Sequence, residues 1–377
     1  MDFSITSEQS SLYDSMRRLA REVVLPGAAE RDRSGTWDPD VWKQLAAAGV
    51  VGMPIPVELG GSGGSIIDCC LVNEALAEGG TDGGLGLSLG AHWVIGTVPI
   101  WLHGTPEQQQ RWLPGLCDGS LIGAWASTEP EAGSDAAALT TTAVRDGDDW
   151  VLDGTKMFIT NGPIADVCTV LARAPEGPTA FVVDATNPGF RVGRELDKMG
   201  CRSSPTAEIV LDGCRVRDRD VLGTVGHGLW EVAFECFDWE RTVMLSSSVG
   251  AMRAGLDATI RYAKERRQFG KPIGHFQAVA HKIADMEINY QACRNAVYRA
   301  AWLKQEGLEH ALEAAVAKAL LGRLAVENAL EAIQVHGGYG YLRDVPAERA
   351  LRDAKLIGIG GGTTEIQKVV ISRLLLA

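Results

Sequence analysis

The apolar residues of this chain change their spacing twice, and this double change constrains the fold more than any other feature. Residues up to about 120 follow the three- and four-residue spacing of one helix face. From Leu121 the pattern becomes short β-branched or aromatic runs separated by turn pairs such as Asp146-Gly147. From Gly228 the helical spacing returns in long pieces. The sequence therefore predicts three domains: an N-terminal α-helical domain (1–120), a middle antiparallel β domain (121–225) and a C-terminal four-helix bundle (226–377).

The expected elements follow from these patterns and from their start and stop signals. Thr6 or Ser7 can cap the first helix, and Pro106 suits the first turn of another. The expected helices cover residues 7–28, 40–48, 66–78, 85–102, a segment from 106, 229–265, 275–305, 309–335, 346–355 and 364–376. The expected strands cover residues 140–145, 150–152, 167–172, 180–183 and 207–211.

Composition and charge exclude several classes of protein. A net charge of −12 opposes nonspecific binding to nucleic acid or to an anionic membrane. The start of the chain lacks a basic region followed by an apolar run, and no stretch approaches the roughly 18 apolar residues of a spanning helix. The eight cysteines form no CxxC pair, which favours reduced thiols over disulfides or a metal site. We expect a soluble cytoplasmic protein without a bound metal.

Two glycine-rich segments, three alternating arginines and Glu240 each have a structural interpretation when they are considered alone. The glycine-rich segment 60–64 lacks the Lys-Ser/Thr ending of a P-loop, and 223–228 lacks the βαβ context of a dinucleotide site, so both are interpreted as connectors. Alternation of Arg215, Arg217 and Arg219 would place three guanidinium groups on one side of a strand, as a solvated face or as a docking surface for an acidic partner. Glu240, taken alone beside Arg241, is typical of a surface ion pair.

Six motifs in a fixed order carry more information than composition. They are Thr128-Glu129-Pro130-Glu131-Ala132-Gly133-Ser134-Asp135, Lys156-Met157-Phe158-Ile159-Thr160-Asn161-Gly162, Arg266-Arg267-Gln268-Phe269-Gly270-Lys271-Pro272-Ile273 with Gln277, Gln334-Val335-His336-Gly337-Gly338-Tyr339-Gly340, Arg352-Asp353-Ala354 and Gly362-Thr363-Thr364-Glu365-Ile366. Together they span most of the chain, which resembles the acyl-CoA dehydrogenase superfamily. This resemblance implies an FAD-dependent oxidoreductase that forms an α,β double bond in an acyl thioester.

The resemblance implies a flavin site built from two groups of residues. The first group contacts the isoalloxazine ring and the adjoining part of FAD: Trp125, Ser127, Thr128, Gly133, Ser134, Phe158, Thr160, Thr363 and Glu365. The second group reaches the FAD of a neighbouring subunit: Arg266, Phe269, Gln277, Gln334, Gly337 and Gly338. Stacking on an aromatic ring and a forked cation on phosphate are physically suited to these roles. Members of the superfamily assemble as homotetramers, each a dimer of dimers.

The resemblance gives two possible positions for the base that removes the α proton. Many relatives carry it in a Tyr-Glu-Gly-Thr element, where this chain has Gly360-Gly361-Gly362-Thr363. A second group, similar to isovaleryl-CoA and long-chain acyl-CoA dehydrogenases, carries the base on a bundle helix just before an arginine. We therefore expect Glu240 to be the base and the backbone N–H of Gly361 to donate to the thioester oxygen. The expected substrate-binding residues are Ser134, Asp238, Arg241 and Gly360.

The resemblance leaves the substrate open. The segments 162–166 and 196–205, with the residues around Glu240, resemble most closely the enzymes that oxidise acyl or aminoacyl groups on carrier proteins in natural-product biosynthesis, such as prolyl-carrier-protein dehydrogenases. The alternatives are a short- or branched-chain acyl-CoA dehydrogenase, an acyl-thioester oxidase that uses O₂, a flavin-dependent monooxygenase or nitroalkane-oxidising relative, and a catalytically inactive acyl-binding subunit. For a dehydrogenase, the expected electron acceptor is a partner such as electron-transfer flavoprotein.

Overall fold

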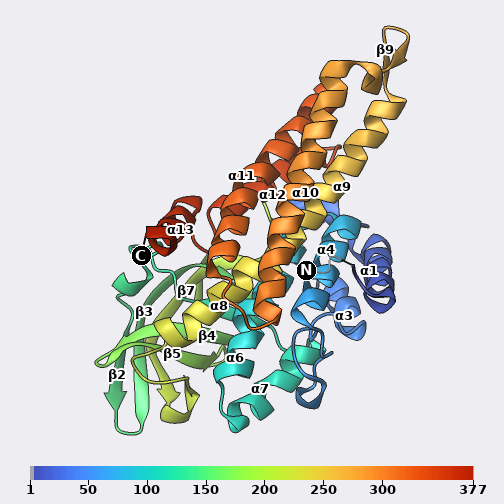
Figure 1. The fold of residues 1–377 in the computed structure, drawn as a ribbon. Helices are drawn as coiled ribbons and strands as arrows, with labels where there is room; N and C mark the ends of the chain where they lie inside the picture. The colour runs from blue at the N-terminus through green and yellow to red at the C-terminus, as the bar shows by residue number, and fades with distance from the viewer. Residues whose placement is uncertain (1–3, 377) are drawn as a thin grey trace.

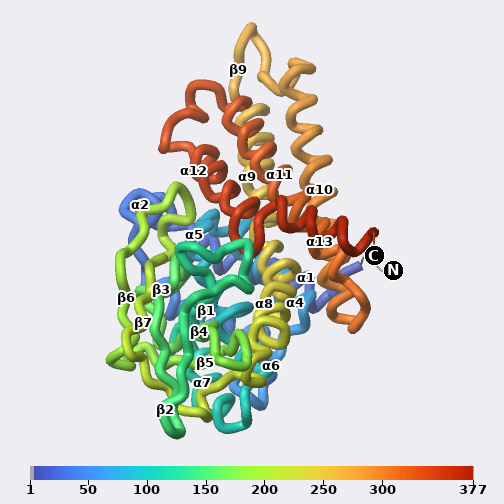
Figure 2. Tube along the Cα trace, turned by 90° about the vertical axis from the view of Figure 1, so that its left-hand side faces the viewer, coloured from blue at the N-terminus to red at the C-terminus, as the bar shows by residue number. Residues whose placement is uncertain are grey.

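The computed structural model describes residues 4–376 as three domains (Figures 1 and 2). In Figure 1 the N-terminal helices and the sheet lie side by side, and the bundle projects beyond both, with a small hairpin at its tip. This arrangement confirms the predicted helical, β and helical order.

The N-terminal domain contains helices of both regular and widened geometry. Its elements are α1 (Ser7–Leu19), η1 (Ala20–Val24), α2 (Ala28–Ser34), α3 (Pro39–Ala47), η2 (Val57–Leu59), α4 (Ile66–Gly80), α5 (Gly83–Gly90), η3 (Ala91–Thr97), α6 (Val98–His103) and α7 (Pro106–Asp118). Thr6 and Thr105 each cap a helix in a capping box. The single helix expected over 7–28 is wrong at its end, because Pro26 and Gly27, with φ of 91°, interrupt it before α2 begins.

One helical run of this domain qualifies the expectation about membrane spans. The segment Gly83–His103 is long and apolar enough to cross a membrane, contrary to the expectation that no stretch approaches this length. However, 72% of its most apolar window is buried inside the protein. It contributes Leu89, Trp93 and Val98 to a core that is shared with the sheet and with α8. The run is therefore a core helix.

The middle domain is a mixed sheet rather than a purely antiparallel one. Its strands are β1 (Gly123–Ala126), β2 (Thr142–Asp146), β3 (Asp149–Thr160), β4 (Val167–Ala174), β5 (Gly177–Asp184), β6 (Phe190–Glu195), β7 (Thr206–Arg217) and β8 (Val221–Leu222). They follow the order β6-β7-β3-β2-β4-β5-β8, and β1 pairs with β4. The β1–β4 and β2–β4 pairs are parallel, which corrects the prediction. The four-residue strand β1, which was not among the expected strands, is too short for its pairing to be predicted from the sequence.

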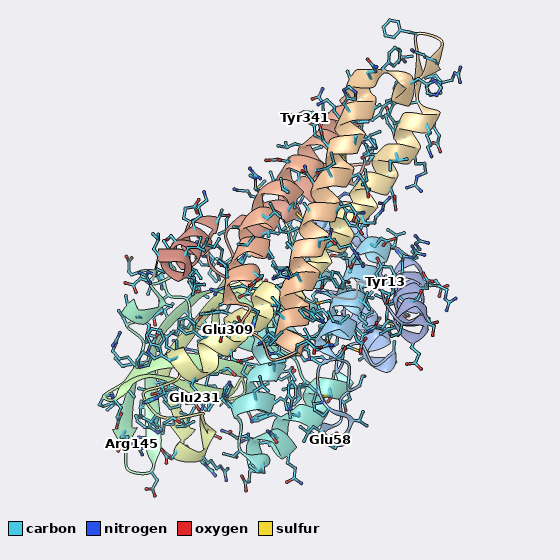
Figure 3. All side chains as sticks on the ribbon, in the orientation of Figure 1. Tyr13, Glu58, Arg145, Glu231, Glu309 and Tyr341 are labelled. Carbon is cyan, nitrogen blue, oxygen red and sulfur yellow. The ribbon has the colours of Figure 1, made fainter. Side chains whose placement is uncertain are left out.

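The C-terminal domain is the predicted bundle. Its main elements are η7 (Leu229–Ala233), α8 (Phe234–Trp239), η8 (Glu240–Met244), α9 (Leu245–Glu265), α10 (Gln277–Gln305), α11 (Ala311–His336), α12 (Ala347–Ala354) and α13 (Thr364–Leu376). The strands β9 (Arg267–Gln268) and β10 (Lys271–Pro272) form the hairpin at the tip. Figure 3 places Tyr341 on the distal half of the bundle, away from the sheet.

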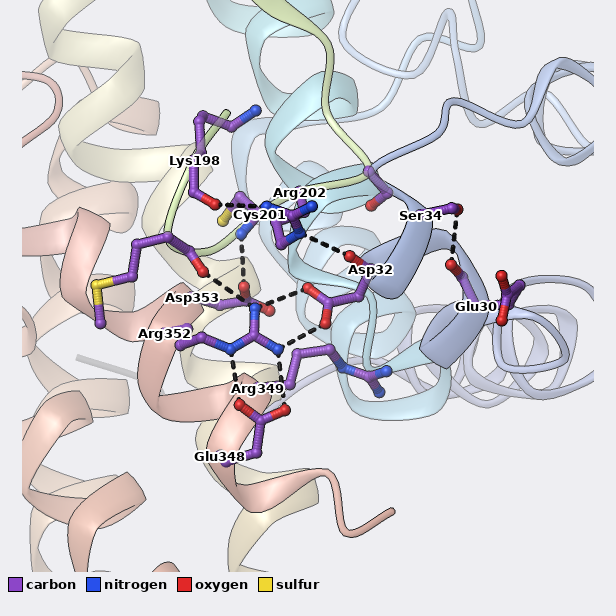
Figure 4. A network of polar contacts seen from close by, with 12 residues as sticks. Glu30, Asp32, Ser34, Lys198, Cys201, Arg202, Glu348, Arg349, Arg352 and Asp353 are labelled. Carbon is purple, nitrogen blue, oxygen red and sulfur yellow. Dashed lines mark hydrogen bonds and ion pairs between the residues drawn. The ribbon is translucent and has the colours of Figure 1, made fainter. Parts of the chain in front are cut away.

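Buried polar contacts fix the domains to one another. On α4, the buried Glu74 accepts hydrogen bonds from Arg294 (2.9 Å) and Tyr298 of α10. Between the bundle and the N-terminal domain, Arg352 of α12 forms two bonds with Asp32 of α2, at 2.9 and 2.6 Å (Figure 4). A loop of the β domain is held in the same network. This rigid frame surrounds the candidate site.

Candidate active site

Glu240 lies at the first residue of a widened, π-helical turn between α8 and α9. Such turns inside a helix are frequent at functional sites, because they redirect side chains from the regular helix face. The flanking side chains of Trp239 and Val243 are buried in the core shared by the N-terminal and β domains, which fixes the helix at this point. The Glu240 carboxylate instead borders a cavity of about 960 Å³. The surface ion pair suggested by the isolated sequence is therefore wrong.

The Glu240 carboxylate lies directly against Gly361. The two positions that the sequence suggests for the base therefore meet in the structure. The backbone of Gly361 has a φ of 63°, and a Cβ at this position would lie 2.4 Å from Oε1 and 2.5 Å from Cδ of Glu240. Both distances are too short for a side chain at position 361 while Glu240 keeps its position. Gly360, the preceding residue, lines the same cavity. The carboxylate thus occupies the space that a side chain at position 361 would take.

Burial dominates the electrostatics of this carboxylate. Desolvation raises the pKa of Glu240, and the positive charges of Lys318 and Arg241 oppose the rise. Burial also lowers the pKa of Arg241. The guanidinium carbon of Arg241 lies 5.5 Å from the ring centre of Phe237. A carboxylate with a raised pKa is a stronger base once it is ionised. The site therefore suits abstraction of a weakly acidic proton.

Lys318 is a cavity residue that sequence reasoning missed. It lies on α11, is 4% exposed and donates a hydrogen bond of 2.8 Å from Nζ to the carbonyl oxygen of Ile357. A signal was present in the sequence, because Lys318 follows Ala314, Ala315 and Ala317 on a face that is otherwise apolar and buried. A lysine on such a face must have a partner inside the protein.

The predicted flavin-ring residues around Thr128 and Phe158 lie where the segment after β1 runs beside β3. Phe158 sits at an irregularity in the β3–β7 pairing, has a φ of 62°, and is 65% exposed. The hydroxyl of Ser127 accepts a hydrogen bond of 2.8 Å from Trp125 Nε1, and Thr128 O accepts one of 2.8 Å from Met157 N. The two flavin motifs are thus adjacent strands of backbone. A strained aromatic residue facing outward beside polar groups is a suitable platform for a planar ligand.

An ion pair that the sequence did not assign joins these two motifs. Lys156 Nζ lies 2.7 Å from Glu129 Oε1, and the two side chains are 0% and 1% exposed. Burial alone would raise the pKa of Glu129, but hydrogen bonds from Lys156, Thr141 and Thr140 outweigh it and hold this pKa at about 2. Both members of the pair were quoted in the motifs, and only the fold shows that they meet.

The remaining predicted residues of the ring side are partly accounted for. Gly133 and Ser134 lie in an exposed loop after the Glu129–Ala132 bridge, with open space around Gly133. The hydroxyl of Thr363 accepts from Ile366 N at 3.2 Å and so caps α13, while Glu365 is exposed on its first turn. These positions are compatible with contacts to a bound cofactor.

Asp238 lies near Glu240 in sequence but is engaged in ion pairs. Its carboxylate pairs with Lys304 Nζ at 3.1 Å and with His310 Nε2 at 2.5 Å. The residues that line the cavity around Glu240 include neither Asp238 nor Arg241 within the described part of the chain. The charge of Asp238 is thus paired with α10 and with the loop after it, and its role in steering the substrate stays a prediction. Arg241 lies instead beside the loop of residues 357–362, called here the glycine loop, with its terminal nitrogen 3.4 Å from a Cβ built at Gly362.

The second group of predicted cofactor residues lies at the distal tip of the bundle. Arg266, Gly337 and Gly338 line a hollow of about 470 Å³. The nearby residues Phe269, Gln277 and Gln334 are exposed, with Phe269 at 92%. The 26 positions from Glu240 to Arg266 correspond to roughly 39 Å of helix at 1.5 Å per residue. Glu240 and the second group of residues are therefore far apart within one chain.

Comparison with known proteins agrees with this geometry. The chain matches the N-terminal (residues 6–120), middle (124–214) and C-terminal (226–376) domain models of acyl-CoA dehydrogenase. It is 39% identical to the mitochondrial isovaleryl-CoA dehydrogenase of Pongo abelii, over 98% of this chain and 89% of the relative.

Two solved structures resemble the whole chain. The prolyl acyl carrier protein oxidase AnaB has a TM-score of 0.96 and 36% identity, with 99% of this chain and 100% of that one covered. The FAD complex of PigA has a TM-score of 0.96 and 35% identity, with 100% and 99% covered. The chain therefore belongs to the acyl-CoA dehydrogenase family. It is an oxidoreductase of a family whose members bind FAD, and its exposed Phe158 platform fits that cofactor.

Proposed function

We propose that this protein oxidises an acyl or aminoacyl thioester to its α,β-unsaturated form. FAD, when bound, accepts the hydride that leaves the β carbon. Glu240 takes the α proton, and the backbone N–H of Gly361 donates to the thioester oxygen as negative charge develops there. The contact between the Glu240 carboxylate and Gly361 inside a large cavity carries this proposal, because it brings a base and a backbone donor to one point.

The substrate we propose is tethered to a carrier protein. Support comes from the likeness to AnaB, named as a prolyl acyl carrier protein oxidase. Gly360, which lines the cavity, leaves room at the acyl end for a ring or a branch. The likeness to isovaleryl-CoA dehydrogenase supports the alternative of a branched-chain acyl-CoA substrate. The role would then be in a catabolic rather than a natural-product pathway.

Anaerobic reduction of the flavin tests both proposals at once. The purified holoenzyme is mixed with a panel of acyl-CoAs and with the same acyl groups, plus prolyl, loaded on a carrier protein. Bleaching of the yellow colour by the carrier-bound members alone is the expected result. Bleaching by free acyl-CoAs at equal rates would overturn the carrier preference, and no bleaching by any thioester would favour an inactive acyl-binding subunit.

An oxidase is the second candidate, and the name of AnaB favours it. Reoxidation in air with release of one hydrogen peroxide per product would establish it. Slow reoxidation in air with rapid transfer to electron-transfer flavoprotein would establish a dehydrogenase.

The proposed assembly is a cytoplasmic homotetramer in which each FAD is shared by two chains. The separation of roughly 39 Å between Glu240 and the distal cofactor residues supports sharing, because a cofactor whose ring lies beside Glu240 would have to span that distance to reach Arg266 of the same chain. Light scattering of the holoenzyme tests the tetramer. Arg266→Ala should lower FAD content without changing the circular dichroism of the protein.

A further inference from the structure

The buried ammonium of Lys318 needs a physical reason. Within residues 4–376 it donates one hydrogen bond, to the carbonyl oxygen of Ile357 at 2.8 Å. Removing an ammonium from water costs several kcal/mol unless opposite charge and hydrogen bonds compensate. A neutral side chain could pack against the apolar face of α11 at no such cost. The charge must therefore be used inside the cavity.

The first use is mechanical, since α11 holds the glycine loop at two points one turn apart. Lys318 holds Ile357, and a Cβ built on Gly322 would lie 3.1 Å from the Cα of Gly358. Residues four apart on a helix share one face, so both contacts act on the same side of the loop. The loop then runs through two further residues to Gly361. Anchoring of Ile357 therefore limits where the Gly361 amide can lie.

The second use is electrostatic. The groups that act on Glu240 come from three elements: Arg241 on its own helix, the thiol of Cys236 on α8, and Lys318 on α11. The thiol is neutral because burial raises its pKa well above the ordinary value. Burial also lowers the pKa of Lys318, while Glu240 opposes this. The two cations therefore favour the ionised form of Glu240 against desolvation.

We propose that Lys318 is a positioning residue for proton abstraction, holding the loop that carries the Gly361 amide and placing a positive charge on the Glu240 side of the cavity. One side chain then sets both the hydrogen-bond donor to the thioester oxygen and the charge state of the base. This inference rests on the proposed dehydrogenation, and its test includes a measurement that needs no substrate.

Two variants separate the two uses. Lys318→Gln removes the charge but keeps a donor for Ile357, whereas Lys318→Met removes both at similar volume. Lys282→Met is the control, because Lys282 pairs with Glu331 on the same bundle and does not line the cavity. FAD content and melting temperature verify that each variant is folded and loaded.

Three measurements follow on the holoenzymes. The pH midpoint of anaerobic flavin reduction should rise by about one unit in both Lys318 variants, since loss of a nearby cation favours the protonated form of the base. The infrared carbonyl band of a bound thioester without α hydrogens should lose its shift in Lys318→Met and keep most of it in Lys318→Gln. Hydrogen exchange of residues 357–362 in the substrate-free enzyme should accelerate at least about tenfold in Lys318→Met only.

The results expected for Lys282→Met are those of the wild type in all three. An unchanged pH midpoint together with unchanged exchange in Lys318→Met would overturn the inference. If no thioester reduces even the wild-type flavin, the proposed function fails, and the exchange measurement then decides the positioning role alone.

Discussion

The contact between Glu240 and Gly361 makes Gly361→Ala the most informative single substitution. The left-handed backbone at position 361, with φ of 63°, would cost an alanine roughly 1–2 kcal/mol in stability. Its Cβ would lie 2.4 Å from Glu240 Oε1, where ordinary contact begins at 3.4 Å. The carboxylate must therefore retreat by about 1 Å, a displacement that can reduce a catalytic rate about 100-fold, or about 2.7 kcal/mol in the barrier.

Stopped-flow spectroscopy of anaerobic flavin reduction measures this effect. The FAD content of Gly361→Ala should equal that of the wild type, because the flavin platform on β3 is not altered. Gly358→Ala is the matched control in the same loop, since its Cβ would meet Thr364 Oγ1 at an ordinary 3.4 Å and its backbone needs no left-handed conformation. It should reduce the flavin within about threefold of the wild-type rate.

A compensating change sharpens the test. Glu240→Asp shortens the side chain by one methylene and withdraws the carboxylate from position 361. Combined with Gly361→Ala, it should lose less activity than the product of the two single losses, because the two changes relieve one overlap. A Gly361→Ala enzyme that reduces flavin at the wild-type rate, or strictly multiplicative losses in the double variant, would refute the reasoning.

Three further predictions rest on the same structure. Because burial raises the pKa of Glu240 above 4.5, the rate of flavin reduction should fall as pH drops through a midpoint above that value, since the protonated carboxyl cannot accept the α proton. Anaerobic reduction rates against pH, with the inactive Glu240→Gln as baseline, measure this midpoint. A midpoint at 4.5 would contradict the prediction. Glu129→Gln should destabilise the protein by about 3–5 kcal/mol in denaturant unfolding, because it leaves Lys156 buried without a counter-charge, and a loss below about 1 kcal/mol would disprove this. Phe158→Asn should weaken FAD binding about tenfold in titrations. The melting temperature of the FAD-free protein should stay unchanged or rise, because asparagine tolerates a positive φ. Unchanged FAD affinity with lower stability would argue against the stacking role.

The sequence predicted the parts of the fold that depend on local interactions. Long runs without proline, together with their start and stop signals, located α4, α10 and α11 to within a few residues, because such signals are local to the chain. Caps and turn pairs marked most boundaries for the same reason, while Pro26 was overlooked as an interruption. The parallel pairing of β1 was not predictable, since pairing joins segments far apart in sequence.

The residues of the candidate site likewise fall into those that the sequence predicted and those that only the structure revealed. The order of motifs identified the family and the FAD residues, and the glycine at position 361 pointed to Glu240 as the alternative base. Only the tertiary structure decided that the Glu240 carboxylate fills the space beside Gly361, that Lys318 enters the cavity, and that Asp238 is engaged elsewhere. These outcomes depend on packing between helices, because burial and the proximity of charges are properties of the assembled interior rather than of any one segment.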